Sequence, residues 1–315
     1  MDNINRLITE KFKIGFEFEF YVKNSAIENY LNLKNDKKIQ KIPKEILNKY
    51  GHLFQHKIKT NNFDYRIAGE YFKFKLQKIY PNEIWNNAFS VTEDGSLRYI
   101  DSTTPLELVY KHQFSHDALR QLKQILSVLQ SPDFITTTNC GLHINISFID
   151  VSKNTKDFAF ELSKHLDIST IKEKFGRKNN KYCEDNKKTS LDLEYAFEDT
   201  FSGNGFRNLL TGGKKETLGN ILEGIEKLKK PDRFKMFLNM IESSVKDSCI
   251  DTWRDNRPAI APRKSSSGNY IEFRATGGKN YQHRQEDIIN TINEYLKSML
   301  ATEKSLSKQK MKVSI

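Results

Sequence analysis

Cysteine is scarce in this sequence. Only Cys140, Cys183 and Cys249 occur among 315 residues, and no two of them form a Cys-x-x-Cys pair. Thiols so few and so scattered exclude a disulfide framework and a cysteine-based metal site. This usage suits a reducing compartment, and we expect a cytoplasmic protein.

Long apolar runs are missing too. No stretch approaches the roughly 20 apolar residues of a transmembrane helix, and residues 1–6 lack the apolar core of an export signal. We therefore expect no membrane partner. A nucleophilic serine or cysteine arrangement is not evident either. Cys140 and His143 fall on one expected strand without an orienting partner, which disfavours a thiol protease.

The composition is that of a globular protein of good size. Hydrophobic residues make up 37% of the chain, phenylalanine alone occurs 21 times, and the mean hydropathy is -0.66. No internal repeat and no linker is visible. We expect a single domain over 1–315, with an insertion at 24–80 and a flexible basic tail at 304–315.

The chain is basic, with a formal net charge of +11 and a sequence pI of about 9.3. The lysines are spread along the chain among asparagine and isoleucine, without a concentrated stripe. Such a charge favours anionic partners, phosphates included. A nucleic-acid partner stays open as an alternative.

The segment 14–20, Ile-Gly-Phe-Glu-Phe-Glu-Phe, alternates aromatic and acidic side chains. On a strand, successive side chains point to opposite faces, so the three phenylalanines share one face and Glu17 and Glu19 the other. The aromatic face can bury against helices. The two carboxylates repel each other unless water or a cation lies over them. A half-exposed strand whose glutamates merely meet solvent is the alternative.

Three later stretches repeat this device. Glu107 in 105–110, His143 in 139–148, and Glu272 with Arg274 in 269–275 each stand opposite an apolar strand face. The four strands predict an α+β fold, in which helices cover one face of a sheet and the other face is a polar floor. Gathered carboxylates and an imidazole suit Mg²⁺ or Mn²⁺, and Mg²⁺ on carboxylates usually also carries nucleotide phosphates.

The remaining patterns predict further elements. We expect strands at 71–79 and 89–92, a turn at Asp94-Gly95, helices at 115–130 (capped by Ser115), 157–166, 217–229, 231–245 and 284–300, and an irregular basic loop at 253–264.

Five motifs in order resemble the amidoligases, carboxylate–amine ligases related to glutamine synthetase and glutamate–cysteine ligase. They are Gly15-Phe16-Glu17-Phe18-Glu19, Asp94-Gly95-Ser96-Leu97, Glu107-Leu108-Val109, Cys140-Gly141-Leu142-His143 and Glu272-Phe273-Arg274. A further stretch, from Gly176-Arg177 to Tyr182-Cys183, is similar to another motif of that family. The resemblance spans about residues 12–300.

The resemblance implies a curved, mainly antiparallel sheet like the glutamine synthetase catalytic domain, with ATP and two or three divalent cations. It assigns Glu17, His143 and Glu272 to one cation, and Glu19 and Glu107, with Asp94, to another. Arg274 would contact the transferring phosphate, so Arg274 and Glu272 are the expected catalytic residues. We expect Arg263, Lys264 and Arg177 beside Arg274 at the nucleotide.

The implied reaction phosphorylates a substrate carboxylate to an acyl phosphate, which an amine attacks to give an amide. The family often has His-Val-His where this chain has His143-Ile144-Asn145, which puts the role of a second histidine in doubt. Two alternatives therefore stay open: a non-catalytic structural or interaction protein that keeps the fold, and a protein that binds or modifies nucleic acid.

Overall fold

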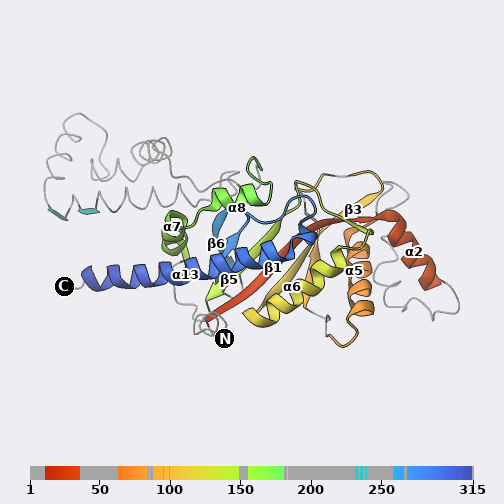
Figure 1. The fold of residues 1–315 in the computed structure, drawn as a ribbon, viewed down its shortest axis with the longest axis horizontal. Helices are drawn as coiled ribbons and strands as arrows, with labels where there is room; N and C mark the ends of the chain where they lie inside the picture. The colour runs from red at the N-terminus through yellow and green to blue at the C-terminus, as the bar shows by residue number, and fades with distance from the viewer. Residues whose placement is uncertain are drawn as a thin grey trace, which may run out of the picture.

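The computed structural model describes residues 11–35, 63–148, 155–180 and 258–313, a few positions within them excepted, together with Cys183 and scattered positions between 231 and 239. In these residues the chain forms one seven-stranded sheet and six α-helices (Figure 1). The strands are β1 (Phe12–Lys23), β2 (Phe89–Thr92), β3 (Thr103–Phe114), β4 (Phe134–Ile135), β5 (Leu142–Phe148), β6 (Ile260–Ser265) and β7 (Gly268–Phe273). The helices are α2 (Asn24–Asn35), α5 (Tyr65–Ile79), α6 (Ser115–Leu129), α7 (Thr155–His165), α8 (Ile168–Lys174) and α13 (Gln285–Val313).

The sheet runs in the order β2-β3-β1-β5-β7-β6, with β4 paired to β1 off this path. All of these pairings are antiparallel. The sheet is open and curved, and helices α6 and α13 lie across it (Figure 1). The predicted mixture of helices with an antiparallel sheet is confirmed.

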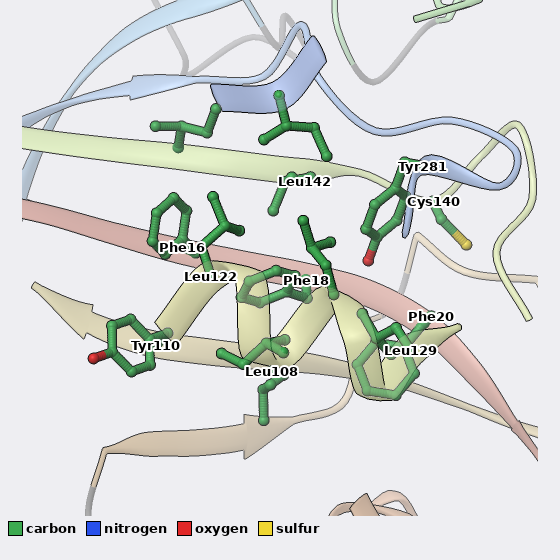
Figure 2. Close-up of a cluster of buried hydrophobic side chains, with 14 of the residues drawn as sticks. Phe16, Phe18, Phe20, Leu108, Tyr110, Leu122, Leu129, Cys140, Leu142 and Tyr281 are labelled. Carbon is green, nitrogen blue, oxygen red and sulfur yellow. The ribbon is translucent and has the colours of Figure 1, made fainter. Parts of the chain in front are cut away.

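The apolar face of β1 forms the centre of the core. Phe16, Phe18 and Phe20 are fully buried, and they point toward Leu122 and Leu129 of α6 (Figure 2). Burying a phenylalanine side chain contributes roughly 2 kcal/mol relative to leaving it exposed. The buried aromatic residues thus fix one face of the strand against the core. The glutamates between them must therefore point to the opposite face.

Residues 71–79 form part of helix α5, so the predicted strand there is wrong. Phe72, Phe74 and Leu76 alternate with basic residues, but Phe72 and Leu76 are also four apart, the spacing of one helix face. Phe72 and Leu76 are fully buried, whereas Phe74 is 39% exposed. Asp64 begins the helix by accepting a hydrogen bond from the Arg66 N–H. Packing against β2 and β3 decides in favour of the helix.

The irregular loop predicted at 253–264 is also wrong for its last residues, because β6 begins at Ile260. Pro262 lies within this strand. At a sheet edge a strand tolerates proline, since the missing N–H costs no ladder hydrogen bond, and β6 is the edge strand next to β7.

The other predicted elements that fall within the described residues agree in place and differ at their ends. Helix α6 begins at Ser115, but Phe114 occupies the capping position. Helix α13 continues to Val313, well beyond the end predicted near residue 300. The helix predicted at 217–229, most of 231–245 and the middle of the 24–80 insertion lie outside the described residues. No helix in the described ranges is both long and apolar enough to cross a membrane.

Asp133 joins α5 to the turn that follows α6. Its carboxylate accepts hydrogen bonds from the Tyr71 hydroxyl at 2.6 Å, the Lys75 ammonium at 2.9 Å and the Ser131 hydroxyl at 3.0 Å. Burial raises the pKa of Asp133, but these hydrogen bonds outweigh burial and hold it below its ordinary value.

We expect Asp133→Ala to lower the free energy of unfolding by about 1–2 kcal/mol near pH 7, because three donors lose their acceptor. Since the pKa is lower in the folded state, this contribution is complete above the unfolded pKa of about 4 and disappears as the pH falls through the folded value. Urea unfolding near pH 7 and about pH 3 measures it. Asp101→Ala, at an exposed position, is the control; an equal loss at both pH values would contradict the assignment.

Candidate metal centre

The register of the sheet brings the acidic face of β1 against polar residues of both neighbouring strands. Glu19 stands directly opposite Glu107 of β3, and Glu17 directly opposite His143 of β5. One strand further, Asn145 of β5 stands opposite Glu272 of β7. Directly opposed residues of antiparallel strands share a face. The predicted polar floor is therefore present.

His143 lies at the centre of this floor and is 4% exposed. Its Nδ1 is 2.9 Å from Glu17 Oε2 and 3.3 Å from Glu272 Oε1, and its Nε2 is 3.3 Å from Glu19 Oε1. Burial and the positive charge of Arg274 lower the pKa of His143, but the three carboxylates outweigh them and raise it to about 10. At neutral pH the ring is an imidazolium that offsets the acidic charge.

Glu272 is held by two arginines as well as by His143. Its Oε2 accepts a hydrogen bond from Arg263 Nε at 2.5 Å, and its Oε1 lies 2.8 Å from an Arg274 guanidinium nitrogen. Burial raises the pKa of Glu272, but the cationic partners outweigh it and hold the pKa far below its ordinary value. This carboxylate is therefore ionised at neutral pH.

Glu19 and Glu107 are less well compensated. Burial raises the pKa of Glu19, although its Oε2 accepts the Gly141 N–H at 2.5 Å. Burial, reinforced by the charge of Glu17, raises the pKa of Glu107 to about 7, while Thr92 donates to it at 2.8 Å. A carboxyl with that pKa is half protonated at neutral pH, and a cation beside it would favour its ionised form.

Glu17, Glu107 and His143 together could hold a metal ion. One possible ligand atom from each of the three residues lies within 4.8 Å of those of the other two. His143 Nε2 is buried and makes no hydrogen bond within the described part of the chain. Two carboxylates and one imidazole suit Mg²⁺ or Mn²⁺, provided that the imidazolium releases a proton on binding. By this chemistry the residues present fit a divalent cation.

The grouping differs from the one that the resemblance implied. Glu272 contacts His143 but forms ion pairs with Arg263 and Arg274. Glu107 instead joins Glu17 and His143 in the group that could hold a metal ion. Asp94 accepts hydrogen bonds from the backbone and the hydroxyl of Ser96, in the turn after β2. Its charge nevertheless acts on Glu19.

The three basic residues expected at the nucleotide occupy different environments. Arg263 lies on the polar floor against Glu272. Lys264, the next residue on β6, is exposed, and strand alternation turns it to the opposite face. Arg177 is 1% exposed and donates from Nη1 to the Cys140 carbonyl at 2.6 Å. In this structure it supports the turn that carries Gly141.

Sequence reasoning did not assign roles to Gly141, Thr92 or Asn145. Asn145 lies two residues after His143 and therefore on the same strand face, and this spacing could have indicated that it belongs to the site. Strand register places Thr92 opposite Glu107, and a turn brings the Gly141 N–H to Glu19. Residue spacing alone specifies neither arrangement.

A family model described as "Putative amidoligase enzyme" matches residues 10–236, more than half of the chain. The chain therefore belongs to the amidoligase family, as the motifs indicated. The matched region contains Glu17, Glu107 and His143 and ends before β6 and β7. A search of curated proteins and a search of solved structures each give no match.

Gly141→Ala is expected to abolish divalent-cation binding while the protein still folds. A Cβ at this position would come within 2.7 Å of His143 Nε2 and 3.0 Å of Glu19 Oε1, so it would displace both side chains. Titration calorimetry with Mn²⁺ measures the loss. Gly176→Ala is the control. It also replaces a glycine and strains the backbone, at φ 67°, but its added Cβ meets no atom within 4 Å and displaces no side chain. If Gly141→Ala binds Mn²⁺ as the parent does, the cluster is not the metal site.

Proposed function

We propose that this amidoligase is an ATP- and Mg²⁺-dependent carboxylate–amine ligase that acts in the cytoplasm and forms an amide bond. The observation that carries the proposal is the cluster of half-buried Glu17 and Glu107 with buried His143, with Arg274 and Arg263 beside it at Glu272. A structural role does not require several carboxylates on one buried face, because burying charge is costly unless it is matched. Membership of the amidoligase family supports the same reading.

Glu17, Glu107 and His143 would hold one cation, and Glu19 with Asp94, whose charge acts on Glu19, would supply further carboxylate ligands. Two or three Mg²⁺ or Mn²⁺ ions are proposed in all. When bound, they would neutralise charge on the nucleotide phosphates. The antiparallel floor backed by helices is compatible with a sheet like the glutamine synthetase catalytic domain.

Arg274 would stabilise the transferring phosphoryl group. Its side chain is 11% exposed, and its Nε has no hydrogen-bond partner in the described ranges. A guanidinium offers several donors in a fixed plane, which suits the oxygens of a phosphoryl group. Glu272 would orient Arg274, because it lies 2.8 Å from the guanidinium.

In the proposed reaction, an oxygen of the substrate carboxylate attacks the γ-phosphorus of ATP, and the bond to ADP breaks. The amine nitrogen then attacks the acyl phosphate carbon, inorganic phosphate leaves, and the nitrogen loses a proton to form the amide. The proposed partners are therefore one carboxylate and one amine substrate. Each could be a small molecule or a group on a peptide or other macromolecule.

Titration calorimetry of a non-hydrolysable ATP analogue, with and without Mg²⁺, tests the proposal. We expect binding that requires the metal and that falls at least about 10-fold in Glu17→Gln and in Glu272→Gln, because each loses a charge from the floor. Glu294→Gln, at an exposed position of α13, is the matched control and should bind as the parent does.

Binding without metal, or binding unchanged in both site variants, would contradict the ligase. It would favour the non-catalytic alternative, in which the carboxylates are retained without use. The net charge of +11 needs a separate control. Attraction to nucleic acid that disappears at moderate salt reflects charge alone.

A further inference from the structure

One peptide unit, between Cys140 and Gly141, joins an acidic side chain to a basic one. Its N–H, which belongs to Gly141, donates to Glu19 Oε2 at 2.5 Å. Its carbonyl oxygen, which belongs to Cys140, accepts from Arg177 Nη1 at 2.6 Å and from the Gly278 N–H at 2.8 Å. The guanidinium and the carboxylate therefore lie at opposite ends of the same amide group.

Gly141 holds Glu19 at two points. The backbone N–H of Glu19 donates to the Gly141 carbonyl at 3.0 Å, in addition to the hydrogen bond from Gly141 to the side chain. The other carboxylate oxygen of Glu19, Oε1, lies 3.3 Å from His143 Nε2. The contact with Gly141 thus decides which oxygen of Glu19 faces the histidine on the polar floor.

The hydrogen bond from Arg177 constrains the direction of the Gly141 N–H. A peptide unit is planar, so holding its carbonyl oxygen also fixes the direction in which its N–H points. Hydrogen bonds in series polarise one another in a low-dielectric interior, so a cationic donor on the oxygen makes the N–H a stronger donor. Arg177 can therefore act on Glu19 without touching it.

The surroundings of Arg177 are built around this contact. The side chain is 1% exposed, and its Nε and Nη2 have no hydrogen-bond partner within the described residues, so Nη1 makes the hydrogen bond of this guanidinium. Gly277, at φ 112°, leaves the necessary space, because a Cβ there would come within 2.9 Å of Arg177 Nη1 and 2.8 Å of the Cys140 carbonyl oxygen. The buried positive charge is therefore directed at one acceptor, the Cys140 carbonyl.

We propose that Arg177 is a positioning residue of the candidate metal centre, which orients the Glu19 carboxylate through the peptide unit between Cys140 and Gly141. The motifs placed Arg177 at the nucleotide, but its guanidinium is buried and donates to a backbone carbonyl. The orienting role follows from the hydrogen bonds at the two ends of the peptide unit. Only the effect of Arg177 on cation affinity rests on the proposed function.

The first test observes the Gly141 N–H directly, by NMR of the full chain with isotopic labelling of the glycine nitrogens. The chain has 15 glycines, and the Gly141 signal is the one missing from the spectrum of Gly141→Ala. Arg177→Met keeps the approximate length of the side chain and removes its donors. In this variant we expect the Gly141 signal to move upfield and its exchange with solvent to become faster, because its hydrogen bond to Glu19 weakens.

The second test measures Mn²⁺ affinity by calorimetry, without nucleotide. Arg177→Met should weaken binding at least about 10-fold, as the loss of a residue that orients a metal ligand commonly does. The same substitution in a Glu19→Ala background should change the affinity by less than about 2-fold, since Arg177 acts through Glu19. Arg177→Lys keeps a cationic donor and should retain more of the affinity than Arg177→Met.

Tyr71→Phe is the control for a general loss of stability. It removes a buried hydroxyl that donates to Asp133, on a part of the molecule that does not contact the polar floor. This variant should leave both the Gly141 signal and the Mn²⁺ affinity unchanged. Circular dichroism and thermal unfolding verify that each variant folds.

An unmoved Gly141 signal in Arg177→Met overturns the inference, whatever the calorimetry gives. An equal loss of Mn²⁺ affinity with and without Glu19 also overturns it, because Arg177 would then act by another route. The same holds if the signal moves but Arg177→Met binds Mn²⁺ as the parent does. If the parent itself binds no Mn²⁺, the proposed metal site fails, whereas a moved signal still supports the orienting role of Arg177.

If Arg177→Met does not fold, Arg177→Lys takes its place in the NMR test. An ammonium is a point charge and cannot reproduce the planar guanidinium. The Gly141 signal should then move in the same direction by a smaller amount, and an unmoved signal again overturns the inference.

Discussion

Repulsion between carboxylates on the inner face of β1 is the constraint on which the rest of the site depends. Glu17 and Glu19 share a face, and the register adds Glu107 directly opposite Glu19. Such a group is unstable when buried unless cations match it. The His143 imidazolium and Arg274 supply part of that match. His143 lies on β5 and Arg274 directly follows β7, both on the side of β1 away from β3.

The same alternation that gathers the charges also fixes them in place. Phe16, Phe18 and Phe20 pack against α6 on one side of β1, so the intervening glutamates cannot rotate away from the floor (Figure 2). A one-residue slip of the strand would bury carboxylates in the core and expose the aromatic residues. The same strand therefore determines both the packing of the core and the geometry of the site. Mutations in β1 are expected to change the stability of the protein and ligand binding together.

The family match covers residues 10–236, yet the floor is completed by β7, which lies beyond it. Pairing of β7 with β5 places Glu272 beside His143, and pairing with the edge strand β6 adds Arg263. Charge balance explains why these later strands belong to the site. Without their two arginines, the histidine alone would face four glutamates.

The sequence by itself determined the strand faces, because alternation of side chains is a local property of the backbone. That suffices to predict Glu17, Glu19, Glu107, His143 and Glu272 on one polar floor, and the apolar residues opposite them. Only the tertiary structure decided that 71–79 is a helix. The spacing of Phe72 and Leu76 fits both the alternation of a strand and one face of a helix, and packing selects the helix. It also decided that Glu107 lies within reach of Glu17 and His143 in a group that could hold a metal ion, that Glu272 is engaged by arginines, and that Asn145 donates to Glu17. Those choices depend on strand register and on charges distant in the sequence, and residue spacing specifies neither.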